Sequence, residues 1–536
     1  RRWKRRCVRV KLENEGCVGV ASKLQAVARN GSAGRRTQRA TLNAVSALLD
    51  YSARLAVNFV VTPILVRGLG SAQFGFWQIL GRLVAYVSVA DGRPTQALKW
   101  VVANHQESAD DHSKRRLVGS ALFVWLRFLP LLLLAGAILV VLAPLILKAP
   151  PEFHTIARVA CGVMVLNLVL QGLVGLPEAT LRGMNLGYKR MGVVAGLNVL
   201  GGALMTTAVH LGWGLIGVAA AQLLLSICTG LLFWYLVRRY LPWFGVERPS
   251  SQEIRRFTGL GFWYLAWALV NKLLIASDVV VLGMLLSSET VTSYVLTGYL
   301  SNSVVGIISL VVGAAIPGIG GLVGRKEFAR VLSVRQELRA LTTLVLSVVG
   351  GTILLWNSTL IGFWVGQDKY AGGWVNLLLM LATAQLVFIR NDAFIIDVTL
   401  ELPRKVLLGA AAVILSVGFS AFLVPRLGVA GVPLGFIVGR SVLTLTYPRL
   451  VAGYFGKEEH QRTGFPRPLI VMASIFACSA YLGERIDVES KVLAAVLAAG
   501  TFVVLAGIAA TAALTPEQRR SLRARVRIIT DRIPAS

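Results

Sequence analysis

The amino-acid sequence predicts an all-α integral membrane protein with about fourteen transmembrane helices. Hydrophobic residues make up 55% of the chain and charged residues only 15%, with a mean hydropathy of +0.67. Soluble domains carry a much larger charged fraction, so lipid is the expected solvent for this surface. Long apolar stretches begin at about residue 41, and the plan of the first one recurs about 217 residues later.

The apolar stretches have the length that a bilayer requires. A helix of roughly 22 residues, rising 1.5 Å per residue, crosses a hydrocarbon core about 30 Å thick. Spans of this length occupy most of the chain after residue 41, which leaves no room for a soluble catalytic domain. The expected spans are 43–66, 74–98, 117–147, 155–181, 189–210, 214–237, 258–285, 290–323, 338–364, 373–399, 404–425, 429–452, 468–483 and 490–514.

An internal repeat predicts two six-helix lobes followed by two further helices. The first span and its turn, Arg54–Ser71, match the span Leu273–Leu286 and its turn. The segment His210–Leu224 resembles Arg426–Gly439 at nearly the same offset. Because each lobe has an even number of spans, both copies face the same way across the membrane. The expected divisions are a basic tail without fixed structure (1–40), the first lobe (41–245), the second lobe (246–456), helices 13 and 14 (457–514) and a basic amphipathic tail (515–536).

The loop charges predict the orientation. Loops on one side of the expected topology contain 22 Lys and Arg residues, and loops on the other side contain 6. The positive-inside rule places the basic side and both termini in the cytoplasm, across a bacterial-type inner membrane. The net charge of +29 is therefore attributed to cytoplasmic loops, and nucleic acid is not an expected partner. The basic stretch Gly324–Leu341 is expected to lie along the inner leaflet.

Motifs for metal binding or catalysis are absent from the sequence. The five cysteines are scattered without CxxC or Cys/His spacing, so we expect neither a zinc site nor a disulfide framework. No HExxH, GxSxG or P-loop motif occurs, and no expected outer loop is long enough to act on glycans. We therefore expect no enzyme activity, cofactor or metal, and a membrane glycan polymerase or ligase is the disfavoured alternative.

Basic residues inside the expected spans are candidates for a binding site. Each charge costs about 2.5–3.5 kcal/mol to insert, so such residues should face protein or water. Arg54 and Lys272 lie 218 residues apart, at nearly the same point of the first span of each lobe. Arginine can bind phosphate oxygens in bidentate fashion and lysine acts as a point charge, which suggests an anionic ligand. The predicted cationic site consists of Arg54, Lys272, Arg82, Arg93 and Arg390.

Acidic residues inside the spans are candidates for coupling to H⁺ or Na⁺. These residues are Asp278, Asp91 and Asp397. The alternative is that each acid simply neutralises a neighbouring cation. Arg390 and Asp397 share a helix face at a spacing of seven residues, and Asp50 lies one turn before Arg54.

Several segments resemble the oligosaccharide flippases of the multidrug/oligosaccharidyl-lipid/polysaccharide exporter (MOP) superfamily. They are LVRGLGSAQFGFWQIL (Leu65–Leu80), SDVVVLGMLLSSETVTSYVL (Ser277–Leu296) and the Leu-Gly turns before spans six and twelve. Each segment alone is weak evidence, but their order, spacing and duplication together are fairly specific to the superfamily. The resemblance covers residues 41–514. The chain departs from the family at Asp91–Pro94, where a cation and a helix breaker replace an Asp-Leu-Gly-Leu-like turn.

The resemblance implies a transporter that moves an undecaprenyl-pyrophosphate-linked oligosaccharide across the membrane by alternating access, for cell-surface polysaccharide synthesis. It also implies a polysaccharide polymerase or glycosyltransferase as a possible partner. A cation-coupled multidrug exporter and a lipid II flippase are the alternatives within the same superfamily. The excess of intramembrane cations over acids favours an anionic cargo.

Overall fold

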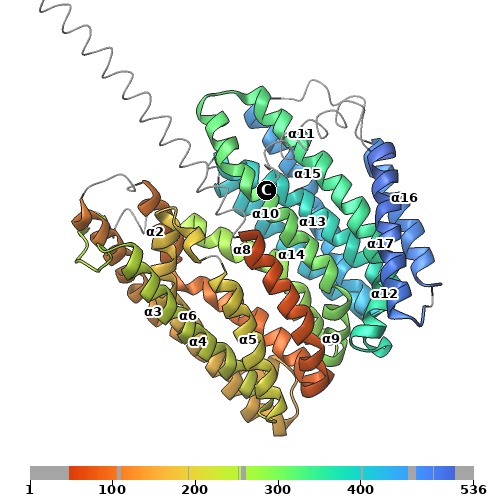
Figure 1. Ribbon diagram of the computed structural model, residues 1–536, viewed down its shortest axis with the longest axis horizontal. Coiled ribbons are helices and arrows are strands. Elements are labelled where there is room, and N and C mark those ends of the chain that lie inside the picture. The colour runs from red at the N-terminus through yellow and green to blue at the C-terminus, as the bar shows by residue number, and fades with distance from the viewer. Residues whose placement is uncertain are drawn as a thin grey trace, which may run out of the picture.

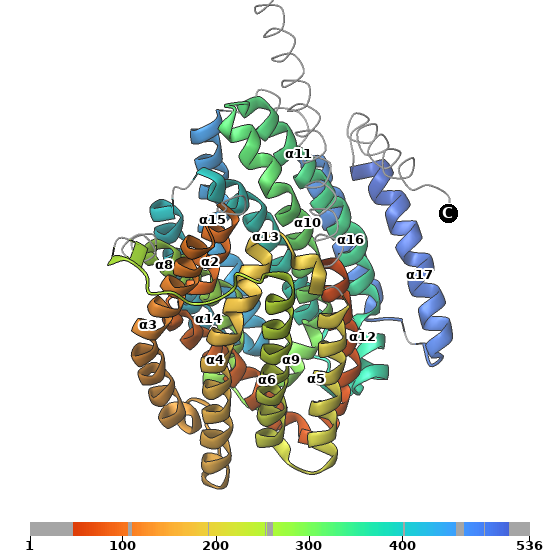
Figure 2. The same cartoon turned by 60° about the vertical axis from the view of Figure 1, so that its left-hand side comes forward.

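The computed structural model describes residues 47–104, 110–190, 192–251, 253–254, 261–399, 402–456, 466–486 and 488–513. Every regular element in these residues is helical, which confirms the predicted fold class. The expected tails 1–40 and 515–536 lie outside the described residues. Figure 1 shows two groups of helices that meet at one end of the molecule. In Figures 1 and 2 the C-terminal helices α16 (Pro466–Gly483) and α17 (Lys491–Ile508) lie on the outer side of the second group.

The first helical stretch, Ala47–Asp91, contains two membrane crossings. Its 45 residues would extend about 68 Å as one straight helix, more than twice the thickness of a hydrocarbon core. Gly70 has a φ of 76°, in the left-handed region that interrupts a regular helix and favours glycine. In Figure 1 the red ribbon runs to the lower end of the molecule and the orange continuation leads back up. The predicted turn after the first span is therefore centred on Gly70.

The first lobe continues from the second crossing through five more helices. The second crossing ends in a short 3-10 turn, Ser88–Asp91, and resumes as α2 after a break of two residues. The four later crossings follow in sequence, and their boundaries agree with the expected spans within a few residues. The helices are α2 (Pro94–Asn104), α3 (Asp111–Ile146), α4 (His154–Gly183), α5 (Val193–His210) and α6 (Gly214–Tyr240).

The second lobe repeats the plan with two irregular spans. Its second crossing bends by 52° between α9 and α10, at Gly298, and its third runs from α11 through a π-helical turn into α12. The helices are α8 (Gly261–Leu285), α9 (Ser288–Thr297), α10 (Tyr299–Gly324), α11 (Phe328–Val345), α12 (Gly351–Trp364), α13 (Gly373–Thr399), α14 (Leu402–Leu427) and α15 (Gly431–Phe455).

Among the described residues, ten helical stretches are long and apolar enough to cross a membrane, and the bent pair α9–α10 is an eleventh. Two of the ten, Ala47–Asp91 and Leu402–Phe455, each contain two crossings. The shorter apolar helix α16 (Pro466–Gly483) completes the predicted fourteen, and α17 (Lys491–Ile508) is the last crossing. The chain is thus a multi-pass membrane protein.

Small residues allow close packing of α14 against α15. Gly435 and Gly439 are four residues apart, so they share one face of α15. A Cβ at Gly435 would lie 2.4 Å from the backbone nitrogen of Ser420, and one at Gly439 would lie 2.2 Å from that of Ser416. Lipid supplies no hydrophobic driving force between helices, so such close backbone contact is a main source of their association.

The two lobes meet through a reciprocal contact that reflects the internal repeat. Thr292 donates a hydrogen bond of 2.6 Å from its hydroxyl to the carbonyl oxygen of Ser71. A Cβ at Gly75 would lie 1.9 Å from the carbonyl oxygen of Ser288. Ser288 and Thr292 are each 217 residues after Ser71 and Gly75, so the contact has the form of a two-fold interface. The lobes are also in contact where the Phe59 and Trp364 rings stack, with centroids 4.8 Å apart.

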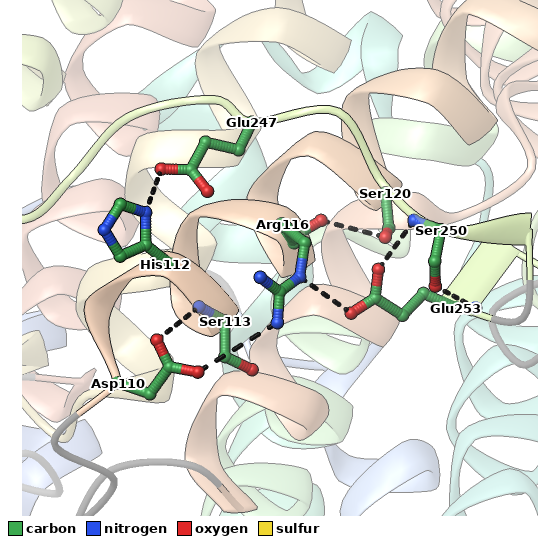
Figure 3. Close-up of polar contacts among 8 residues, drawn as sticks. All are labelled: Asp110, His112, Ser113, Arg116, Ser120, Glu247, Ser250 and Glu253. Atoms are coloured by element: carbon green, nitrogen blue, oxygen red, sulfur yellow. Dashed lines mark hydrogen bonds and ion pairs between the residues drawn. The ribbon is translucent and has the colours of Figure 1, made fainter.

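The segment between the lobes is held against the start of α3 by polar contacts (Figure 3). Glu247 accepts a hydrogen bond from His112 at 2.9 Å, and Glu253 accepts one from the Arg116 guanidinium at 3.3 Å. Ser250 and Glu253 cap each other: the Ser250 amide donates to the Glu253 carboxylate and the Glu253 amide donates to the Ser250 hydroxyl. We call Arg116, Ser250 and Glu253 the linker clamp.

One expectation about the loops is wrong. The basic stretch Gly324–Leu341 does not form a separate surface helix, because Phe328–Trp364 is one long helical crossing. Its Arg335 is 2% exposed and forms a bidentate ion pair with Asp392 of α13, at 2.8 and 3.1 Å. A buried carboxylate on a neighbouring helix therefore turns this arginine inward.

Candidate functional site

A cavity of about 460 Å³ lies between the first lobe and α8. Its volume is within the range of about 300–1,000 Å³ that is typical of small-ligand sites. The wall comes from the second crossing, α4 and α6 of the first lobe, and from one residue of α8. The lining residues are Trp77, Gln78, Gly81, Arg82, Val84, Ala85, Ser88, Met164, Asn167, Leu168, Gln171, Gln222 and Lys272.

Two predicted cations, Arg82 and Lys272, line this cavity from opposite lobes. Arg82 and a third predicted cation, Arg93, lie close enough to Lys272 to repel it electrostatically. Asp91 also interacts with Lys272 and partly offsets this repulsion. Like charges gathered in a low-dielectric region are costly, and an anion bound among them would lower that cost.

The local backbone explains the position of Arg93. The helix stops at Asp91 because Gly92 and Arg93 have φ values of 74° and 52°, both left-handed. A left-handed conformation at a non-glycine residue costs roughly 1–3 kcal/mol and persists only where the surroundings hold it. Here the Arg93 amide donates a hydrogen bond of 2.8 Å to the Asp91 carboxylate. The helix-breaking segment noted in the sequence is thus an ordered break beside the cavity.

Asp278 belongs to a polar group on the second-lobe side. The Tyr294 hydroxyl donates a hydrogen bond of 3.0 Å to its carboxylate, and Arg440 lies within electrostatic reach. Arg440 is 5% exposed, donates to the Leu274 carbonyl oxygen and lies over the Phe436 ring at 4.7 Å. These contacts give Asp278 the structural partners that were the alternative to an ion-coupling role.

Arg390 and Asp397 lie elsewhere in the second lobe and do not line the cavity. Asp397 forms an ion pair with Lys405, whose ammonium group also lies 3.9 Å from the centre of the Trp267 ring. Arg390 lies over Phe394 at 5.7 Å. Lys405 is only 1% exposed, although its position in the sequence suggests a loop. Asp397 therefore pairs with Lys405 and not with Arg390, which shares its helix face.

Arg54 has an exposed side chain and is not among the residues that line the cavity. The predicted cations that line this cavity from both lobes are therefore Arg82 and Lys272, and not the repeat-related pair Arg54 and Lys272. Arg54 and Lys272 lie at matching points of the two lobes in the sequence, but only Lys272 lines this cavity.

Sequence reasoning missed the neutral polar residues of the cavity. Gln78, Asn167, Gln171 and Gln222 lie in apolar spans and line the wall. Buried amides in lipid are also costly unless they find partners, so the argument applied to charges would have identified them. No group of three or more His, Cys, Asp or Glu residues suited to a metal occurs in the described part of the chain.

Comparison with known sequences decides the family. A family profile described as "Polysaccharide biosynthesis protein" matches residues 43–323, more than half of the chain. The chain belongs to this polysaccharide biosynthesis protein family. Its membership confirms the resemblance to the MOP superfamily. No curated protein matches the sequence significantly.

Solved structures show the fold of this polysaccharide biosynthesis family member. An inward-facing multidrug resistance MATE family transporter of the MOP superfamily is 16% identical, with a TM-score of 0.55 over 76% of this chain and 98% of that one. An outward-facing MATE family transporter is 15% identical, with a TM-score of 0.53 over 79% and 97%. A MOP superfamily transporter from Pyrococcus furiosus Vc1, described as having a binding pocket of reverse polarity that suggests a different function, is 16% identical, with a TM-score of 0.53 over 78% and 96%.

These comparisons assign the chain to a superfamily of membrane transporters. The predicted class of protein, a membrane transporter, agrees with the family and with the MATE-like fold. The matched structures are less than 17% identical, so they bear on the fold alone and leave the cargo to the chemistry of the cavity.

Proposed function

We propose that this protein is a flippase that moves an undecaprenyl-pyrophosphate-linked oligosaccharide across the bacterial inner membrane by alternating access. The observation that carries the proposal is the cavity between the first lobe and α8, which Arg82 and Lys272 line in a member of a polysaccharide biosynthesis family. Such a protein would serve cell-surface polysaccharide synthesis, beside glycosyltransferases and a polysaccharide polymerase.

The physical reason is the charge of the cargo. A pyrophosphate group carries dense negative charge, and its transfer into a low-dielectric region is very costly unless it is paired. Cations fixed on both lobes would offset that cost without having to recognise every sugar of the chain. Arg82 and Arg93 lie within electrostatic reach of Lys272, so an anion bound among these three side chains would lower their mutual repulsion.

Two alternatives remain within the superfamily. A cation-coupled multidrug exporter is consistent with the MATE-like fold, but the cationic wall of the cavity disfavours cationic drugs. A lipid II flippase would also carry a pyrophosphate, and it predicts a different phenotype on gene deletion. Coupling to H⁺ or Na⁺ remains part of the proposal, and Asp91 is the candidate acid that interacts with the cavity residue Lys272.

The proposed orientation has both termini in the cytoplasm. It rests on the basic loops, and it places the reciprocal contact between the lobes near the outer surface. Tags inserted at Ser288 and Asp368 should be labelled from outside intact cells, whereas tags at Ser250 and Lys457 should not. External labelling at Ser250 would reverse the orientation or change the number of crossings.

Transport is tested by deleting the gene and complementing it. Deletion should trap the lipid-linked oligosaccharide in the inner leaflet while its assembly continues. Loss of assembly would indicate an enzyme, and arrest of peptidoglycan synthesis would indicate lipid II as the cargo.

Arg82→Gln and Lys272→Gln should each reduce transport at least tenfold at normal abundance in the membrane, because each removes a charge that lines the cavity. The exposed Arg426 provides a matched control, and Arg426→Gln should transport normally. Normal transport by both cavity variants would refute the cationic site.

A further inference from the structure

The wall of the cavity is chemically divided. Arg82 and Lys272 are its charged members, whereas the rest of its polar surface consists of amides, the Ser88 hydroxyl and the Trp77 indole. The amides Gln78, Asn167, Gln171 and Gln222, together with Trp77, form what we call the amide wall. All five residues belong to the first lobe.

The spacing along the helices places amides and charge side by side. Asn167 and Gln171 are four residues apart on α4 and share one of its faces. Gln78 lies four residues before Arg82, so one face of the second crossing passes from an amide to a cation within one turn. A ligand that fits both would carry an uncharged hydrogen-bonding part directly next to an anionic part.

The amide wall has unused hydrogen-bonding capacity. Asn167 is 6% exposed, and its carbonyl oxygen has no hydrogen-bond partner among the described residues, although the side chain lines the cavity. A buried acceptor without a partner costs about 1–3 kcal/mol, and a small rotation of the side chain toward the cavity would let a ligand or water donor recover that cost. An amide both donates and accepts hydrogen bonds, as sugar hydroxyls do, and it adds no charge that would repel an adjacent phosphate.

We propose that the cavity is a two-part site that fixes the direction of the cargo. The amide wall binds the hydroxyl groups of the sugar nearest the lipid, and Arg82 and Lys272 bind the pyrophosphate that links this sugar to the lipid. The sugar thus lies against the first lobe, and the pyrophosphate bridges the two lobes. This inference rests on the proposed function and adds a sugar-binding role to residues outside the cationic site.

The test compares two kinds of lipid probe, without and with a sugar, on the purified full chain in lipid nanodiscs. One probe is undecaprenyl pyrophosphate without sugar; the others carry a single glucose, galactose or N-acetylglucosamine. The wild-type protein should bind at least one sugar-bearing lipid more tightly than the sugar-free lipid. Gln171→Leu and Gln222→Leu should each weaken that sugar-bearing complex about 3–10-fold, as expected for one lost hydrogen bond, and leave sugar-free binding unchanged.

Two comparisons separate the possible outcomes. Arg82→Gln should weaken both kinds of complex, and Gln73→Leu, on the same helical stretch but outside the cavity wall, should change neither. The two-part site is wrong if the wild-type protein binds all probes equally, if the glutamine variants weaken all probes alike, or if no probe binds. If equal binding occurs while deletion of the gene still traps the oligosaccharide, the flippase function stands and the sugar subsite alone is refuted.

Discussion

At the scale of single residues, Gly81 offers a direct way to fill the cavity. It lines the wall, and a Cβ built on it meets no atom within 4 Å. We expect Gly81→Leu to place its side chain in the cavity and to reduce transport at least tenfold. Leucine is a better helix former than glycine by roughly 0.5–1 kcal/mol, so the protein should remain at least as abundant and as stable to heat. Transport assays and thermal unfolding on the same preparation measure both effects.

Gly162 is the matched control for this substitution. It lies in α4, also has open space around its Cβ position, and does not line the cavity. Gly162→Leu should leave transport unchanged. Equal loss of transport in both variants would mean that added bulk acts through helix packing and not through the cavity.

At the scale of elements, the linker clamp joins the segment between the lobes to α3. Burial opposes ionisation of Glu253, but hydrogen bonds from Ser250 and Arg116 outweigh it and hold the pKa of the carboxyl below its ordinary value of 4.5. Because this pKa is lowered on folding, the ionised clamp stabilises the fold above about pH 4.5, and the effect is lost as the pH falls through the folded pKa.

Removing the clamp should loosen the linker locally. We expect Glu253→Ala to speed hydrogen exchange at the backbone amides of residues 247–254 about threefold to tenfold at pH 7, measured by mass spectrometry. Below the folded pKa of Glu253 the difference from wild type should disappear, because the wild-type carboxyl is then protonated and neither protein carries the negative charge of the clamp.

Glu327 provides the matched control for the clamp. It pairs with Arg325 and Arg330 at 2.7 and 2.6 Å at the start of α11, which is outside the segment between the lobes. Glu327→Ala should leave exchange in residues 247–254 as it is. A clamp variant that exchanges like wild type at pH 7 would show that backbone packing alone holds the segment, for example Gly119 against the Glu247 carbonyl oxygen.

At the scale of the whole molecule, the reciprocal contact allows the lobes to be fixed together. In a chain without its native cysteines, Ser71→Cys with Thr292→Cys places one thiol on each lobe where the two residues now share a hydrogen bond. Joining them with a short bifunctional thiol reagent should abolish transport, because alternating access requires the lobes to separate at this end. A reducing agent that cleaves the reagent should restore transport.

A pair of thiols within one lobe controls for the chemistry. Ser420 and Val432 are in contact through a hydrogen bond of 3.1 Å between α14 and the start of α15, both in the second lobe. Linking Ser420→Cys to Val432→Cys should leave transport intact if the lobe moves as a unit. Undiminished transport by the Ser71–Thr292 link would exclude separation of the lobes at this contact as a step of the cycle.

The sequence alone determined the class, the fourteen crossings and the repeat. The lipid environment explains why the sequence suffices: each crossing requires a long apolar run, and each turn between crossings interrupts that run in the sequence. The offset of 217 residues that pairs Ser71 with Ser288 also predicted the relation between the lobes, which the reciprocal contact displays in three dimensions.

Only the tertiary structure decided which polar residues share a site. A sequence shows that a charge lies in a span but not which way the helix turns it, because rotation depends on packing against neighbouring helices. Arg54 and Lys272 thus occupy matching positions, yet only Lys272 lines the cavity. The sequence suggests loop positions for Arg335 and Lys405, whereas the structure buries both side chains and pairs them with the α13 carboxylates of Asp392 and Asp397. The amide wall required the second crossing, α4 and α6 to be assembled before its residues could be seen as neighbours.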